Sequence, residues 1–188
     1  MGAKADALLA MQGRADWFDI AWADLRADQI AAMDERFAER RGAIKLMSHR
    51  AEEAGVEVIA TLPDAVPLLF PHTAYKSYPE SFLAQSKWDR MGKWLSTISP
   101  YAISPIDPAT VNDIDDWIDR LQAAGNYISC SSGTTGKSAM LVASEADMDW
   151  SRVDTVQVFA WGSGVEPAHD RMLIGCAPVA TVPKNVII

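Results

Sequence analysis

The sequence has few of the residues that mark secreted or disordered proteins. Its two cysteines, Cys130 and Cys176, are too few for a disulfide framework. Both lie in apolar runs, which favours reduced core thiols in a cytosolic protein. Glycine (11 residues) and proline (10 residues) are too scarce for a low-complexity segment, and 49% hydrophobic residues are too many for a disordered tail. The 188 residues therefore predict one folded domain or part of a larger one.

Long hydrophobic runs and an excess of positive charge are also absent. No apolar stretch approaches the roughly 18 residues that a membrane-spanning helix needs, and the N-terminus lacks the apolar core of a signal peptide. Lysine and arginine number 17 against 25 acidic residues, which gives a formal net charge of −8. This balance argues against a nucleic-acid partner but allows one local anion site. We expect a cytoplasmic protein with no membrane partner.

Residues 1–125 predict a mostly helical segment with one or two strands. Apolar residues recur at steps of three, four and seven over residues 26–54, which predicts one long helix that Gly55 ends. Residues 56–62 alternate enough to predict a strand, ended by Pro63. The apolar positions of the long helix are Ile30, Met33, Phe37, Ile44, Met47 and Ala51.

Two further helices are expected in this segment. Trp88, Met91 and Leu95 mark the apolar face of one of them, and the next is predicted to open at Asp107 and to end at Gly125. The apolar face of that later helix would comprise Val111, Ile114, Trp117, Ile118 and Leu121. Its solvated face would comprise Asp113, Asp115, Asp116 and Asp119. These four acids lack the glycine and the terminal glutamate of a calcium loop, so no metal site is predicted there.

A glycine-rich loop follows a predicted buried strand at residues 126–130. It reads Ser-Ser-Gly-Thr-Thr-Gly-Lys-Ser over residues 131–138. Its glycines can adopt positive φ, so that successive amides point into one concavity, while the hydroxyls and Lys137 add donors and a positive charge. A polar turn between strands is the purely structural alternative. The length of the loop and its terminal lysine favour the binding of a triphosphate.

Two kinds of phosphate loop are compatible with the ending Gly136-Lys137-Ser138. A Walker loop, G-x-x-x-x-G-K-S/T, needs a glycine where this chain has Ser131, and it leads into a helix. Residues 139–143 predict a second strand instead, and the first helix start after them is Ser144. A P-loop protein of another class, such as a kinase, remains an alternative that a helix beginning at Ser138 would support.

The loop SSGTTGK at residues 131–137 resembles the signature loop of the adenylate-forming superfamily, the acyl- and aryl-CoA synthetases. The amino-acid sequence of the loop is most similar to that of the phenylacetate–CoA ligase branch. Ser138 and Ala139 replace the Pro and Lys that commonly follow the loop in the superfamily. The resemblance implies an α/β fold: a helical lead-in, a strand, the glycine-rich loop, a strand, a helix and a further strand. The last helix would span residues 144–161 and the last strand residues 171–177. Residues 126–188 would then begin an ATP-binding α/β subdomain.

The resemblance also implies an activity. The carboxylate of a small acid attacks the α-phosphorus of ATP and releases pyrophosphate, and a thiol, usually that of coenzyme A, then takes the acyl group from the adenylate. Mg²⁺ would share in neutralising the phosphates. Lys137 and Thr134 would be the catalytic residues. The residues expected to hold the phosphates are Ser131, Ser132, Gly133, Thr134, Thr135, Gly136 and Lys137.

Several motifs that the resemblance implies do not occur in these 188 residues. They are an aromatic-Gly-x-Thr-Glu motif for adenine and magnesium, an aspartate for the ribose, and a distant catalytic lysine. The sequence also stops in the apolar residues Val186, Ile187 and Ile188. We therefore expect a truncated N-terminal piece of a longer ligase, inactive by itself. A non-catalytic remnant is the remaining alternative.

Overall fold

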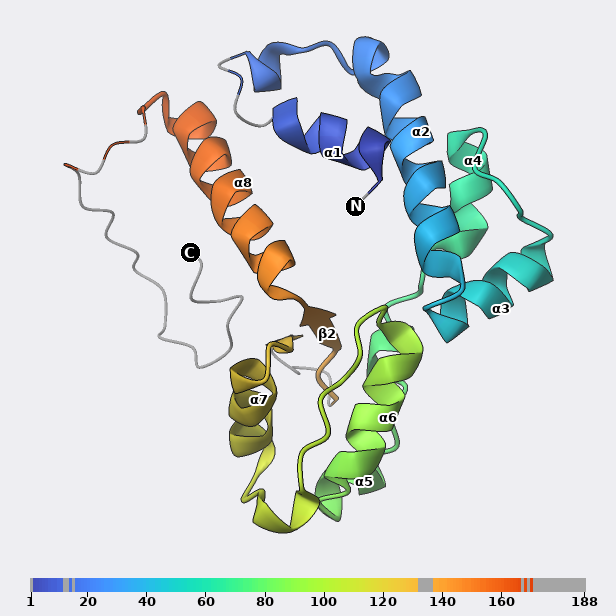
Figure 1. The fold of residues 1–188 in the computed structure, drawn as a ribbon, viewed down its shortest axis with the longest axis vertical. Coiled ribbons are helices and arrows are strands. Elements are labelled where there is room, and N and C mark those ends of the chain that lie inside the picture. The colour runs from blue at the N-terminus through green and yellow to red at the C-terminus, as the bar shows by residue number, and fades with distance from the viewer. Residues whose placement is uncertain are drawn as a thin grey trace. The chain divides into compact units, whose positions relative to one another are not determined.

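The computed structural model describes residues 2–11, 14, 16–131, 137–166, 168 and 170. Over these residues the chain is mostly helical, with one two-stranded antiparallel sheet (Figure 1). The expected combination of helices and strands in one chain is therefore confirmed. The chain divides into two compact units, residues 1–70 (unit 1) and 71–188 (unit 2), so the predicted boundary at residue 125 falls inside unit 2.

Unit 1 is helical and has a small apolar core. Glu35 connects its first two long helices, because its carboxylate accepts hydrogen bonds from the amides of Lys4 and Ala5, each at 3.0 Å. The elements are α1 (Ala3–Ala10), the 3-10 helix η2 (Trp17–Asp19), α2 (Trp22–Arg41), α3 (Lys45–Ala54), α4 (Leu62–Ala65) and the 3-10 helix η3 (Val66–Leu68). The buried core residues are Phe37, Ala51, Ile59 and Leu68.

The single helix predicted over residues 26–54 is wrong, because the chain turns between α2 and α3. Ile44 adopts an extended conformation, and the Ser48 hydroxyl donates a 2.6 Å hydrogen bond to the carbonyl of Arg41 at the end of α2. A straight helix would separate Phe37 from Ala51 by about 21 Å, at 1.5 Å per residue. The turn brings both residues into one core. The predicted end at Gly55 is confirmed, since Gly55 has a left-handed φ of 66°.

The strand predicted over residues 56–62 is also wrong. The Ile59 amide donates a 2.8 Å hydrogen bond to the Asp34 carboxylate rather than to a neighbouring strand. Thr61 then forms a capping box with Asp64, and α4 begins at Leu62. This segment is therefore a loop that the buried side chain of Ile59 anchors to the core, whereas the neighbouring Val58 is 58% exposed.

Unit 2 contains the sheet and the larger core. Its elements are η4 (Ala74–Lys76), α5 (Glu80–Ala84), α6 (Trp88–Ile98), η5 (Pro108–Thr110), α7 (Ile114–Ala123), β1 (Tyr127–Cys130), β2 (Met140–Ala143) and α8 (Glu145–Ser163), where η4 and η5 are 3-10 helices. The buried core residues are Tyr78, Trp88, Met91, Leu95, Trp117, Ile118, Leu121, Ile128 and Met140. The predicted helix at Trp88 is confirmed, and its predicted face is buried.

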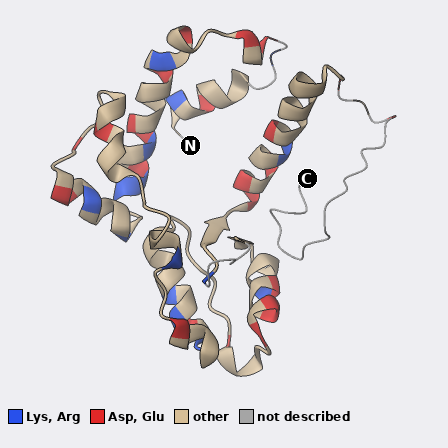
Figure 2. Ribbon diagram, turned by 180° about the vertical axis from the view of Figure 1, so that it is seen from behind, with Lys and Arg blue, Asp and Glu red and all other residues tan. Residues whose placement is uncertain are grey.

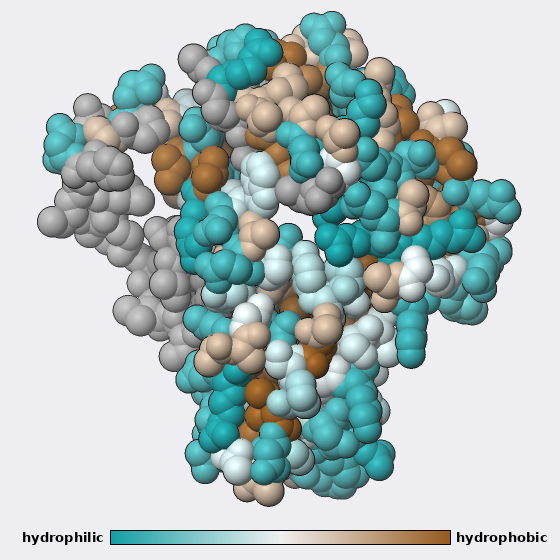
Figure 3. Space-filling model, viewed as in Figure 1, coloured by the Kyte–Doolittle hydropathy of each residue, from teal (hydrophilic) through white to brown (hydrophobic). Residues whose placement is uncertain are grey.

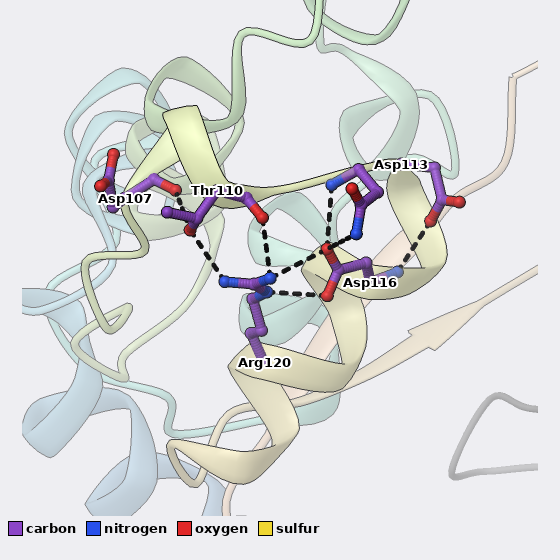
Figure 4. Close-up of polar contacts among 6 residues, drawn as sticks. Asp107, Thr110, Asp113, Asp116 and Arg120 are labelled. Atoms are coloured by element: carbon purple, nitrogen blue, oxygen red, sulfur yellow. Dashed lines mark hydrogen bonds and ion pairs between the residues drawn. The ribbon is translucent and has the colours of Figure 1, made fainter.

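The helix predicted to open at Asp107 instead begins at Ile114. Asp107 caps the short helix η5, and Asp113 caps α7 by accepting a hydrogen bond from the Asp116 amide at 2.9 Å. Arg120 reaches back from α7 to the carbonyl of Thr110 at 2.8 Å and to the Asp116 carboxylate at 2.7 Å (Figure 4). Asp116 is therefore half-buried in a polar network and is not part of a freely solvated face. Four residues of the predicted apolar face, Ile114, Trp117, Ile118 and Leu121, lie on α7 and pack in the core, whereas Val111 packs there from the segment before the helix. The predicted end at Gly125 is confirmed.

Helix α8 follows β2 directly. Ser144 and Asp147 form a capping box at its start. The helix predicted over residues 144–161 is therefore confirmed. Acidic residues outnumber basic ones along both α7 and α8 (Figure 2). Hydrophobic atoms, coloured brown, appear at the surface over α8 (Figure 3). The exposed apolar residues of this helix include Val156 and Phe159, each 50% exposed. The strand predicted over residues 171–177 lies outside the described residues.

Candidate phosphate-binding site

A β-hairpin carries the glycine-rich loop. Strands β1 and β2 pair antiparallel, with Cys130 opposite Met140, so the chain turns back between two neighbouring strands as predicted. Ser131 and Ala139 close the base of the loop. The Ser131 amide donates to the Ala139 carbonyl at 3.0 Å, and the Ala139 amide donates to the Ser131 hydroxyl oxygen at 2.8 Å. These contacts hold the two ends of the loop together beside the sheet.

Of the seven predicted phosphate ligands, the structure describes Ser131 and Lys137. The prediction for the other five concerns residues outside the described part of the chain: Ser132, Gly133, Thr134, Thr135 and Gly136. The Ser131 hydroxyl accepts a hydrogen bond at the base of the loop and keeps its own hydrogen for donation. Ser131 is exposed, so that hydrogen can meet a ligand from solvent.

Lys137 places a positive charge at the end of the loop. Its side chain is half-buried, and its ammonium donates a hydrogen bond to the backbone carbonyl of Tyr78. The same ammonium lies 4.9 Å from the centroid of the Tyr78 ring, within the range of a cation–π contact. An ammonium has three hydrogens to donate. The contact with Tyr78 therefore leaves further hydrogens for an anion.

Tyr78 is the residue of this site that the sequence did not single out. It is fully buried, and its hydroxyl donates a 2.9 Å hydrogen bond to the carbonyl of Ser138. Its ring packs edge to face against Trp94, with 4.8 Å between centroids. Burial raises the pKa of the Tyr78 phenol, which keeps the donor protonated at neutral pH. No sequence pattern connects residue 78 with a loop about 60 positions later, because only the tertiary fold brings them together.

Cys130, the last residue of β1, is a free thiol beside the loop. It is half-buried, and burial raises its pKa, with the charge of Asp115 adding to the effect. A thiol in this environment stays protonated and is a weak nucleophile at neutral pH. Cys130 thus packs against the core of unit 2, as predicted, whereas Cys176 lies outside the described residues.

Metal-ligating side chains do not gather in the described part of the chain. Among these residues, no group of three or more His, Cys, Asp or Glu side chains is arranged to hold a metal ion. Within the same part of the chain, no helix is both long enough and apolar enough to cross a membrane. The local chemistry of the hairpin is that of an ammonium, a hydroxyl and closely spaced backbone groups.

No protein-family model, curated protein or solved structure matches this chain. The interpretation of the site therefore depends on the chain's own residues and on the geometry of the hairpin.

Proposed function

We propose that this chain takes part in the ATP-dependent activation of a carboxylic acid as an acyl- or aryl-adenylate, followed by transfer to a thiol such as coenzyme A. One observation carries the proposal. The loop SSGTTGK, which resembles the signature of adenylate-forming enzymes, connects two antiparallel strands and ends in a half-buried lysine. A lysine held at the end of such a loop is suited to a polyphosphate.

The element after the loop favours this proposal over a Walker-type nucleotide-binding protein. A Walker loop leads directly into a helix whose N-terminus faces the phosphates. In this chain β2 begins at Met140, and α8 begins only at Glu145. Ser138 instead lies between the loop and β2, with its carbonyl bound by Tyr78. This arrangement lends no support to the kinase alternative.

The residues of this chain would act by binding and by charge compensation. An acid carboxylate is a poor nucleophile toward a polyanion, so the reaction needs the phosphate charge to be neutralised and the reactants to be aligned. Lys137 would offset charge on the departing pyrophosphate, and the hydroxyls and amides of residues 131–136 would hold the β- and γ-phosphates. Magnesium would add charge neutralisation when bound with ATP.

Binding of inorganic tripolyphosphate to the chain tests the phosphate site directly. We expect calorimetry to detect binding, and Lys137→Ala to weaken it by roughly tenfold to a hundredfold, as the loss of one charge-assisted hydrogen bond of about 1.5–3 kcal/mol implies. Lys93→Ala is the matched control. It removes the same charge from unit 2, but the Lys93 side chain is 81% exposed on α6 and lies outside the loop. Equal effects of the two substitutions would reject Lys137 as a ligand.

Exchange of labelled pyrophosphate into ATP, driven by a panel of carboxylic acids, tests the adenylation step. These 188 residues contain no aromatic-Gly-x-Thr-Glu motif for adenine and magnesium. They also lack the ribose-binding aspartate and the distant lysine that the resemblance implies. We therefore expect exchange from a polypeptide that joins them to all three features, and none from the 188 residues alone. Lys137→Ala and Thr134→Val should slow the exchange in that longer polypeptide. Absence of exchange there with every acid would favour the non-catalytic remnant.

A further inference from the structure

Tyr78 contacts both residues that follow the glycine-rich part of the loop. Its backbone carbonyl and its ring receive the ammonium of Lys137, and its hydroxyl binds the carbonyl of Ser138 at 2.9 Å. One residue from a distant part of unit 2 thus fixes a side chain and the backbone at the point where the loop returns to β2.

The position of Tyr78 is itself fixed by the core. Its side chain is 0% exposed and belongs to the main apolar cluster, which also contains Met91 and Leu95 of α6. The ring also meets Trp94, whose indole nitrogen donates a 2.8 Å hydrogen bond to the hydroxyl of Ser77. A buried ring with neighbours on α6 has little freedom to follow the loop. Tyr78 therefore provides a rigid reference point for Lys137 and Ser138.

We infer that Tyr78 is a positioning residue of the phosphate loop, which holds Lys137 at the loop before phosphate binds and gives it up to the polyphosphate. The inference rests on the proposed function. The nature of the two Tyr78 contacts allows the Lys137 ammonium to move from Tyr78 to the polyphosphate. A neutral carbonyl and a ring face attract an ammonium more weakly than a polyphosphate with several negative charges does. Tyr78 can thus keep the lysine ordered without competing successfully against the anion.

The contact has a spectroscopic signature that needs no variant. Protons close to the face of an aromatic ring resonate upfield, so the side-chain protons nearest the Lys137 ammonium should resonate upfield of those of exposed Lys93. Titration with tripolyphosphate should move these resonances back toward ordinary values as the ammonium leaves the ring. Lys137→Ala assigns the signals. Upfield signals that persist at saturating tripolyphosphate, or their absence from the start, would overturn the inference.

Binding measurements separate positioning from mere structural support. Tyr78→Phe keeps the buried ring and the backbone carbonyl but removes the hydrogen bond to Ser138. Loss of this bond frees the Ser138 carbonyl and with it the backbone next to Lys137, so we expect tripolyphosphate binding to weaken by up to about tenfold, the upper bound set by one neutral hydrogen bond. In a Lys137→Ala background the same substitution should change binding less than twofold, because the loss depends on the placement of the Lys137 ammonium. Equal losses in both backgrounds would show a general structural role and would overturn the inference.

The two proposals can fail separately. Absence of tripolyphosphate binding by the unsubstituted protein contradicts the proposed function, and with it the role of Tyr78. Binding that depends on Lys137 but leaves the lysine resonances unchanged supports the phosphate site and rejects Tyr78 alone. If Tyr78→Phe fails to fold, the titration of the unsubstituted protein still decides between these outcomes.

Discussion

The buried amide of Asn126 makes a stability prediction that bears directly on the hairpin. Asn126 is 6% exposed and immediately precedes β1. Its Oδ1 accepts a 2.8 Å hydrogen bond from the Ser104 amide, and its Nδ2 donates a 3.0 Å hydrogen bond to the Ala102 carbonyl. One side chain thus satisfies two backbone groups of the segment that connects α6 to η5.

Asn126→Leu should destabilise unit 2 by about 1.5–4.5 kcal/mol. Leucine has the same number and branching of side-chain heavy atoms as asparagine, but it can make neither hydrogen bond. The Ser104 amide, which belongs to a half-buried residue, would lose its partner at a cost of about 1–3 kcal/mol. Loss of the bond to Ala102 adds about 0.5–1.5 kcal/mol, because that residue is exposed and its carbonyl can bind water instead. Such a loss is a large fraction of the total stability of a small domain.

Urea unfolding followed by amide NMR signals of residues 117–130 measures this effect within unit 2 alone. A probe confined to unit 2 is needed because the chain has two compact units, which need not unfold together. Ser104→Ala is the control, since it leaves the backbone amide in place and removes only a 3.4 Å hydrogen bond to Ala124. An Asn126→Leu effect below about 0.5 kcal/mol, the size expected for an ordinary surface substitution, would refute the assigned role of this amide.

Two further predictions concern charge and backbone conformation. Hydrogen bonding from Arg120 holds the pKa of Asp116 below its usual value of 3.8, so this group contributes stability above that pH, and the contribution is lost as pH falls through the lower folded-state pKa. Asp116→Asn should therefore flatten the acid limb of a stability–pH profile measured by urea unfolding, and an unchanged acid limb would contradict this role of Asp116. Gly55→Ala should destabilise unit 1 by roughly 1–2 kcal/mol, because Gly55 has a φ of 66°. Gly42→Ala should be tolerated, since Gly42 has a φ of −73° and no neighbour that an added Cβ would meet. Thermal unfolding of the two variants measures the difference, and an equal loss of stability at both positions would contradict this account.

The sequence predicted the elements whose signals are local. Apolar spacing located α6 and the buried face of α7, and the Ser144 cap located the start of α8. The apolar run before the glycine-rich loop and the run after it predicted β1 and β2. Each of these signals arises within a few residues of the element it predicts, which is why no knowledge of tertiary contacts was needed.

The errors arose where tertiary contacts decide the structure. Apolar periodicity continues through the turn between α2 and α3, so spacing alone cannot locate a break that Ser48 stabilises. Residues 56–62 alternate like a strand, but the Asp34 side chain takes the hydrogen bond of Ile59. Tyr78 is fully buried in the core of unit 2, and no local pattern in the sequence marks it as a neighbour of the loop. Its contact with Lys137 exists because two distant segments of unit 2 meet.

The central claim is that the hairpin loop at residues 131–137 binds the polyphosphate of a nucleotide. An amide chemical-shift map recorded during titration with ATP and Mg²⁺ tests it most directly. We predict that the largest shifts fall within residues 131–138 and at Tyr78, and that inorganic tripolyphosphate reproduces them. Shifts centred elsewhere in the chain, or none at all at millimolar ATP, would contradict the claim.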